Sequence, residues 1–87
     1  MNVEIEPNDF DVWEKLIIWV ILKTRPPPTM HYIADNRQMD IRAVRPRLKK
    51  LYGLNIVGFN LDKTRKRYFL TDKGRILAEK LGFCRKI

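Results

Sequence analysis

The chain has 87 residues and a formal net charge of +8, from 18 lysines and arginines against 10 aspartates and glutamates. This length suffices for one small domain with one hydrophobic core. We therefore expect a single domain over residues 1–87, with an N-terminal extension at 1–8 and a C-terminal tail at 83–87. One cysteine and one histidine exclude an internal disulfide and a Cys/His zinc site, so we predict no metal and no cofactor.

Charge is distributed unevenly along the chain. Residues 1–22 hold one lysine and five acidic residues, so the remainder carries a net charge of +12. This favours a polyanionic partner, nucleic acid before an anionic membrane surface. No apolar run approaches the roughly 18 residues of a membrane span, and the N-terminus lacks signal-peptide features. We expect an intracellular, cytoplasmic protein. Without serine, a glycine-rich phosphate loop or a close carboxylate pair, we predict that it is not an enzyme.

The first predicted helix covers about residues 9–23, and Asn8 can cap it by accepting a hydrogen bond from an amide of the first turn. Apolar residues at steps of three and four predict its core-facing stripe: Phe10, Trp13, Ile17, Val20 and Ile21. Ile18, Trp19 and Leu22 lie off that stripe. The helix is therefore more apolar than one buried face requires, which indicates a partner surface.

Three prolines at residues 26–28 end the first helix, because proline lacks an amide proton and its ring blocks helical continuation. A short second helix of about residues 30–37 follows. Thr29 is its predicted N-cap, and Ile33 and Ala34 can face the core. Asp40 then caps the third helix.

The third predicted helix is amphipathic. One side carries the apolar residues Ile41, Val44, Leu48 and Leu51. A different side carries three cations at steps of three and four: Arg42, Arg45 and Lys49. Pro46 removes one backbone hydrogen bond inside this helix, so a helix that begins near Pro46 is the competing boundary. We favour Asn55 over Gly53 as the left-handed residue that ends it.

A β-hairpin is predicted next, with strands at about residues 56–61 and 67–70 and a turn at 62–66. Thr71 caps a fourth helix of about residues 72–81, which Gly82 closes. Gly74, Leu77, Ala78 and Leu81 share one side of this helix. Ile76 and Phe83 lie on another.

The predicted elements follow the order of a winged helix-turn-helix domain, an α+β fold: helix, helix, turn, helix, two-stranded wing and helix. The segment Arg67-Tyr68-Phe69-Leu70-Thr71-Asp72-Lys73-Gly74 resembles the Y-x-L-T-x-x-G junction of MarR- and PadR-type regulators. The segment Pro46-Arg47-Leu48-Lys49-Lys50-Leu51 is similar to the P-x-L-x-x-L of the PadR-type recognition helix, which small winged-helix proteins of archaea and their viruses share. This sequence departs from the PadR-type pattern at two positions. Arg45 stands where the pattern usually has tyrosine, and Asn55 stands where it usually has glycine.

The resemblance covers about residues 9–82. It implies a sequence-specific double-stranded DNA binder, a transcriptional regulator that is commonly a homodimer. The third helix would enter the major groove, and the wing would follow the backbone or the minor groove. Because winged helices also serve as docking modules, a protein-docking or non-specific architectural role in a larger assembly is the alternative function.

The third helix supplies the main candidates for DNA contact. Arg42 and Arg45 can read base edges, because a guanidinium can bind guanine through two hydrogen bonds. Arg47, Lys49 and Lys50 are candidates for phosphate contacts. The alternative is an ordinary solvated face, but five cations in nine residues without an anion favour DNA.

The wing turn supplies a second cationic group, predicted to contact phosphates or the minor groove: Lys63, Thr64, Arg65, Lys66 and Arg67. A soluble turn that prevents edge-to-edge strand pairing is the alternative. Thr29 and His31 open the second helix, where amides and hydroxyls can hold a phosphate. A solvated His31 without a role is the competing interpretation.

A homodimer interface is predicted through the first and last helices, from Ile18, Trp19, Leu22, Ile76 and Phe83. The alternative is that irregular packing buries these residues within one monomer. Cys84 is expected to be a free thiol rather than a link between subunits.

Overall fold

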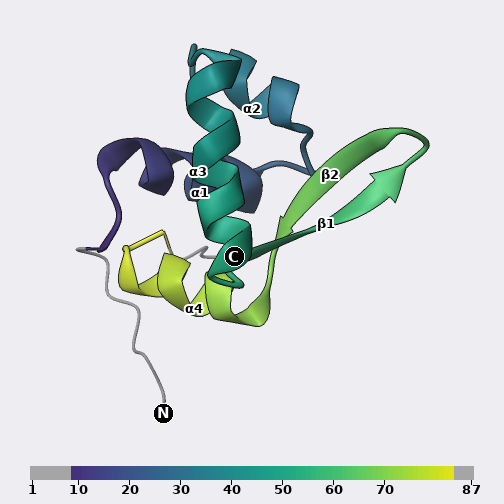
Figure 1. Cartoon of the computed structure of the whole chain (residues 1–87). Coiled ribbons are helices and arrows are strands. Elements are labelled where there is room, and N and C mark those ends of the chain that lie inside the picture. Colours follow the sequence, from purple (N-terminus) through teal and green to yellow (C-terminus); the bar gives the residue numbers. More distant parts are fainter. Residues whose placement is uncertain (1–8, 84–87) are drawn as a thin grey trace.

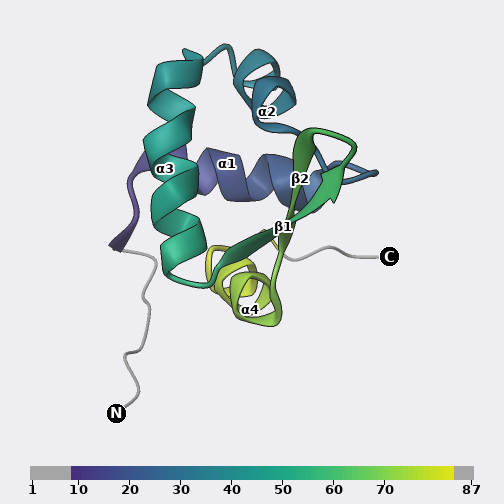
Figure 2. The ribbon, with the colours of Figure 1, turned by 45° about the vertical axis from the view of Figure 1, so that its right-hand side comes forward.

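The computed structural model describes residues 9–83. Its elements are α1 (Val12–Lys23), α2 (Met30–Asn36), α3 (Ile41–Gly53), β1 (Val57–Asp62), β2 (Arg65–Leu70) and α4 (Asp72–Lys80). The helix α3 lies crosswise in front of α1, with α2 beside one end of α3 and α4 near the other, while the β1–β2 hairpin projects from the helices as a wing (Figures 1 and 2). This is the predicted α+β winged helix-turn-helix.

The start of α1 differs from the prediction. The helix begins at Val12, and its N-cap is Asp11, whose side chain accepts a hydrogen bond from the Glu14 amide at 2.7 Å. The Glu14 carboxylate in turn accepts from the Asp11 amide at 3.0 Å, which completes a capping box. Asn8 lies outside the described residues.

The buried face of α1 is also rotated by one residue near its N-terminus. Trp13, predicted in the core, is 45% exposed, whereas Glu14 is only 5% exposed. Glu14 continues the spacing of Ile17, Ile18 and Ile21 at steps of three and four. A carboxylate can occupy this position because the capping box and a cation on α3 satisfy it. Ile18 has no exposed surface, so its predicted place in a dimer interface is wrong: it belongs to the monomer core.

Local capping chemistry fixes α2 and α3 as predicted. The Thr29 hydroxyl accepts from the Tyr32 amide at 3.2 Å, and the Asp40 carboxylate accepts from the Arg42 amide at 2.8 Å. Pro46 lies inside α3, so the competing boundary near Pro46 is wrong. Asn55 takes the left-handed conformation after the helix, with φ of 68°, as predicted.

The wing is longer and its turn tighter than predicted. The strands pair antiparallel from Val57↔Leu70 to Asp62↔Arg65, which leaves a two-residue loop in place of the turn expected at 62–66. Lys63 in this loop has φ of 62°. A third segment supports β2, because the Tyr68 amide donates to the Pro28 carbonyl at 2.8 Å.

One hydrophobic core joins the helices to the base of the wing. Its fully buried side chains include Ile17, Ile18, Ile33, Leu48, Leu51 and Ile56. The start of α4 is held against the turn after α3, because the Thr71 amide donates to the Ile56 carbonyl at 3.0 Å. Gly74 packs so close to that carbonyl that a β-carbon would overlap it. The predicted cap at Thr71 and closure at Gly82, with φ of 83°, are confirmed.

In the part of the chain that the structure describes, no helix has the length and apolar character needed to cross a membrane.

Candidate nucleic-acid interface

An exposed cationic stripe runs along α3. Burial of Val44, Leu48 and Leu51 against the core turns the opposite side of the helix to solvent. Arg45 and Lys49 are exposed there, and neither side chain forms a hydrogen bond or an ion pair with another residue among 9–83. Two cationic groups close together on one rigid helix, with no anion to neutralise them, form a preorganised site for a polyanion.

Arg42 begins the same stripe but has a partner. Its guanidinium contacts the Asp40 carboxylate at 2.9 Å, and the Arg42 side chain is 84% exposed. The hydrogen bond from the Arg42 side chain, followed by the one from its amide, lowers the pKa of Asp40, and the same side-chain bond raises the pKa of Arg42. An exposed pair of this kind contributes little stability, so Arg42 can exchange Asp40 for a ligand at small cost.

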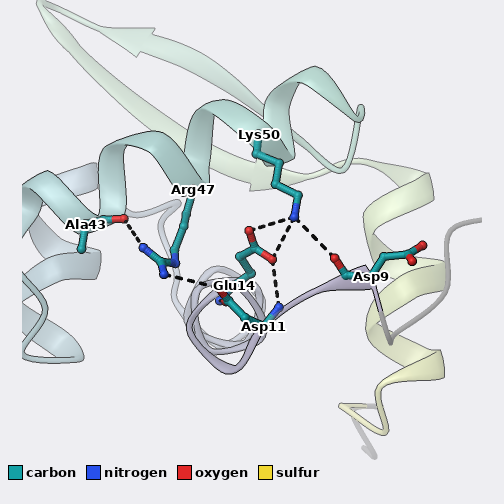
Figure 3. Close-up of polar contacts among 6 residues, drawn as sticks. All are labelled: Asp9, Asp11, Glu14, Ala43, Arg47 and Lys50. Atoms are coloured by element: carbon teal, nitrogen blue, oxygen red, sulfur yellow. Dashed lines mark hydrogen bonds and ion pairs between the residues drawn. The ribbon is translucent and has the colours of Figure 1, made fainter.

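Arg47 and Lys50 point to α1 instead (Figure 3). Arg47 donates to the Ala43 carbonyl at 3.0 Å and contacts the Asp11 carboxylate at 3.3 Å. Lys50 Nζ lies 3.0 Å from the Glu14 carboxylate. At about 100° per residue, both positions lie well away from the Arg45 side of the helix. In the structure both side chains fix α3 against α1, and their role as DNA contacts stays a prediction.

Asp11 shows the electrostatic effect of this contact. Burial by itself would raise the pKa of Asp11, but the hydrogen bonds from the Glu14 amide and the Arg47 guanidinium, with the positive charges of Arg47 and Lys50, outweigh it and lower the pKa. The charged form of Asp11 is therefore favoured in the folded protein.

The wing tip carries the second exposed cationic group. Lys63, Thr64, Arg65 and Lys66 are all exposed. Arg67 differs: its guanidinium contacts the Asp62 carboxylate at 2.9 Å and donates to the Pro27 carbonyl at 2.9 Å. Arg67 therefore ties β2 to the proline-rich segment, and its role as a DNA contact stays a prediction.

At the start of α2, the predicted residues have different environments. The Thr29 hydroxyl is already used as the N-cap, and its backbone forms an isolated bridge with Arg67. His31 is exposed, and Tyr32 beside it is 46% exposed. His31 thus stays a candidate contact, whereas the Thr29 hydroxyl is committed to the helix cap.

Sequence reasoning missed Tyr52, which continues the α3 stripe through Arg45 and Lys49 at steps of four and three. It is 52% exposed. Its ring lies 5.4 Å from that of Phe59 on β1, and Phe59 lies 5.8 Å from Tyr68 on β2. The spacing was visible in the sequence, but the contact with the wing was not.

The remaining residues of the predicted dimer interface lie in several environments. Leu22 and Phe83 are partly buried and line a common open cavity of 640 Å³. Trp19 is half-buried, with the Arg37 guanidinium 4.9 Å from the centre of its ring. Ile76 is 57% exposed on α4. Cys84 lies outside the described residues.

Among the described residues, no group of three or more histidine, cysteine, aspartate or glutamate side chains could hold a metal ion.

The architecture matches solved winged-helix structures. Staphylococcus aureus MarR in complex with salicylate and kanamycin is 27% identical, with a TM-score of 0.76 over 86% of this chain and 51% of that one. A mutant of S. aureus MepR bound to an oligodeoxyribonucleotide is 22% identical, with a TM-score of 0.79 over 86% of this chain and 57% of that one. A protein of Archaeoglobus fulgidus is 24% identical, with a TM-score of 0.74 over 84% of both chains.

The chain therefore has the winged-helix fold of MarR-family proteins, and the archaeal protein shares this architecture. It spans about half the length of the two staphylococcal proteins. No protein-family model matches the sequence, and no curated protein matches it significantly.

Proposed function

We propose that this chain binds double-stranded DNA in a sequence-specific manner and acts as a transcriptional regulator. The observation that carries the proposal is the α3 stripe: Arg45 and Lys49 are exposed without a partner among residues 9–83, while the other α3 cations have structural or exchangeable contacts. The likeness to the MepR structure bound to an oligodeoxyribonucleotide supports the same use of this fold.

In the proposed complex, α3 lies in the major groove. Arg42 and Arg45 read base edges from the N-terminal half of the helix, and Lys49 neutralises a phosphate. The exposed tip of the wing, Lys63–Lys66, contacts the backbone or the minor groove. His31 adds a backbone contact from α2.

A homodimer completes the proposal. Two copies would place two α3 helices in successive major grooves, roughly 34 Å apart, and so read a two-fold symmetric site. Trp19, Leu22, Ile76 and Phe83 remain the candidate interface after removal of Ile18, because each keeps apolar surface outside the core. Sedimentation of the wild-type chain measures its mass in solution, which distinguishes a homodimer from a monomer. We place the protein in the cytoplasm, where such a regulator meets DNA.

The test compares single variants on two DNAs. A preferred site is first selected from a random oligonucleotide pool, and Kd is then measured on that site and on a random duplex across a salt series. Arg45→Ala should cost about 1–3 kcal/mol on the selected site and little on random DNA. Lys63→Ala should weaken both alike and reduce the salt slope by about 1. Lys73→Ala, which removes a charge at the start of α4, is the control and should leave both unchanged.

Equal losses for Arg45→Ala on the two DNAs would contradict base reading by α3. Failure of the selection to enrich any sequence, with no duplex binding at low salt, would reject DNA binding and favour a protein-docking role.

A further inference from the structure

Between α3 and the outer half of the wing lies a partly apolar surface, of which only Lys66 belongs to the cationic contacts proposed above. We name it the helix–wing junction and define it by four side chains: Tyr52, Phe59, Leu61 and Lys66. Tyr52 is 52% exposed and Leu61 67% exposed. Exposed apolar and aromatic surface therefore lies between the α3 cations and those of the wing tip.

The wing register places three of these residues on one face. Phe59 pairs with Tyr68, and Leu61 pairs with Lys66. Because side chains alternate across a strand and paired residues share a face, Phe59, Leu61 and Lys66 project from the same side of the hairpin. The Tyr52 ring lies 5.4 Å from Phe59, so this is the side that meets the end of α3.

The junction combines aromatic ring contacts with one cation. Tyr52, Phe59 and Tyr68 form a continuous series of ring contacts, with centroid separations of 5.4 and 5.8 Å. Lys66 Nζ lies 4.7 Å from the centre of the Phe59 ring. The nearest wing acid, Asp62, lies on the opposite face and is paired with Arg67 at 2.9 Å. No acidic side chain therefore belongs to the junction.

We propose that the helix–wing junction holds the sugar-phosphate backbone of one DNA strand. This inference rests on the proposed function and deepens it. In duplex DNA a single backbone separates each major groove from the adjacent minor groove, so a protein with α3 in one groove and a wing in the next must pass a backbone between them. The four side chains lie on that path.

Their chemistry fits both parts of a backbone. The Tyr52 hydroxyl has no hydrogen-bond partner among residues 9–83, and it can donate to a phosphate oxygen, as can the Lys66 ammonium. The exposed Leu61 side chain and the Phe59 ring edge supply apolar contacts to deoxyribose. The apolar core of a protein–protein interface is depleted of charged side chains, whereas this junction includes the Lys66 ammonium, 4.7 Å from the centre of the Phe59 ring.

The contact differs from the cationic ones in a measurable way. A tyrosine hydroxyl and a leucine side chain release no counterions, so their removal should lower affinity without changing the salt slope. Because a backbone is the same in every sequence, the loss should be equal on the selected site and on a random duplex. Arg45→Ala, by contrast, should raise Kd on the selected site more than on the random duplex.

The experiment uses the full chain with Tyr52→Phe, which retains the ring contact with Phe59 and removes only the hydroxyl. We expect about a three- to tenfold rise in Kd on both DNAs, with an unchanged salt slope. Leu61→Ala should raise Kd about twofold, while Val12→Ala, which trims an aliphatic side chain 63% exposed on α1, should not. Equal thermal midpoints for the variants and the wild type exclude an effect of unfolding.

Uncharged methylphosphonate groups, placed one at a time along the selected duplex, locate the contact. At one position between the α3 and wing sites, the modification should weaken DNA binding by the wild type. The same modification should add little to the loss of affinity that Tyr52→Phe already causes. If Tyr52→Phe and Leu61→Ala bind both DNAs as tightly as the wild type while Arg45→Ala is weakened, the junction proposal is wrong and DNA binding stands. If the wild type binds no duplex, both proposals fail together.

Discussion

The contact between Glu14 and α3 should be among the most sensitive points of the fold. The Glu14 side chain is 7% exposed, and its carboxylate lies 3.0 Å from Lys50 Nζ and accepts from the Asp11 amide at 3.0 Å. Glu14→Ala therefore removes half of the capping box and leaves the Lys50 ammonium with the Asp9 carbonyl at 3.4 Å. Both losses reduce the stability of the folded state, and neither is replaced by another described group.

The magnitude follows from these contacts. Loss of the hydrogen bond from the Asp11 amide contributes about 0.5–1.5 kcal/mol, and loss of the charged hydrogen bond to Lys50 about 1.5–3 kcal/mol. Lys50 is 45% exposed and water can solvate it, so the lower part of each range applies. We expect Glu14→Ala to lower the free energy of unfolding by about 2–3 kcal/mol. Glu14→Gln, which retains an acceptor for the Asp11 amide, should cost about 1 kcal/mol.

Urea unfolding followed by tryptophan fluorescence measures this difference through the midpoint at constant m-value. Glu79→Ala, which removes an exposed carboxylate from α4, is the control and should stay within about 0.5 kcal/mol of the wild type. A Glu14→Ala variant as stable as the control would refute the reasoning, because Glu14 would then be free of the contacts that define its role.

Two further predictions concern packing and pH. Gly74→Ala should destabilise the fold by about 1–3 kcal/mol, since its β-carbon would overlap the Ile56 carbonyl. Gly53→Ala, where nothing lies within 4 Å of the added carbon, should instead stabilise by about 0.5–1 kcal/mol; equal thermal midpoints for the two variants would disprove the packing argument. Because folding lowers the pKa of Asp11 below 3.8, its charge stabilises the protein above the unfolded-state pKa, and this contribution is lost as the pH falls through the folded pKa. The stability difference between wild type and Asp11→Asn should thus be full at neutral pH and vanish in strong acid, and a constant difference in unfolding titrations would contradict it.

The sequence by itself determined the order of the elements and most of their ends. Thr29, Asp40 and Thr71 cap their helices as predicted, because capping depends on a side chain and an amide two or three residues away. The left-handed positions at Asn55 and Gly82 were predictable because asparagine and glycine tolerate a positive φ at the end of a helix. The exposed cations Arg45 and Lys49 followed from helical spacing alone, since the core side of α3 is unmistakably apolar.

Only the tertiary structure decided which cations are available to a ligand. Arg47, Lys50 and Arg67 look like their neighbours in the sequence, yet each binds a group 36, 36 and 40 residues away. Trp13 and Glu14 exchange their expected environments for the same reason, because Lys50 makes the buried carboxylate favourable. Helical periodicity gives the direction of a side chain, but its partner depends on which elements the chain brings together, and that is set by the packing of the whole core.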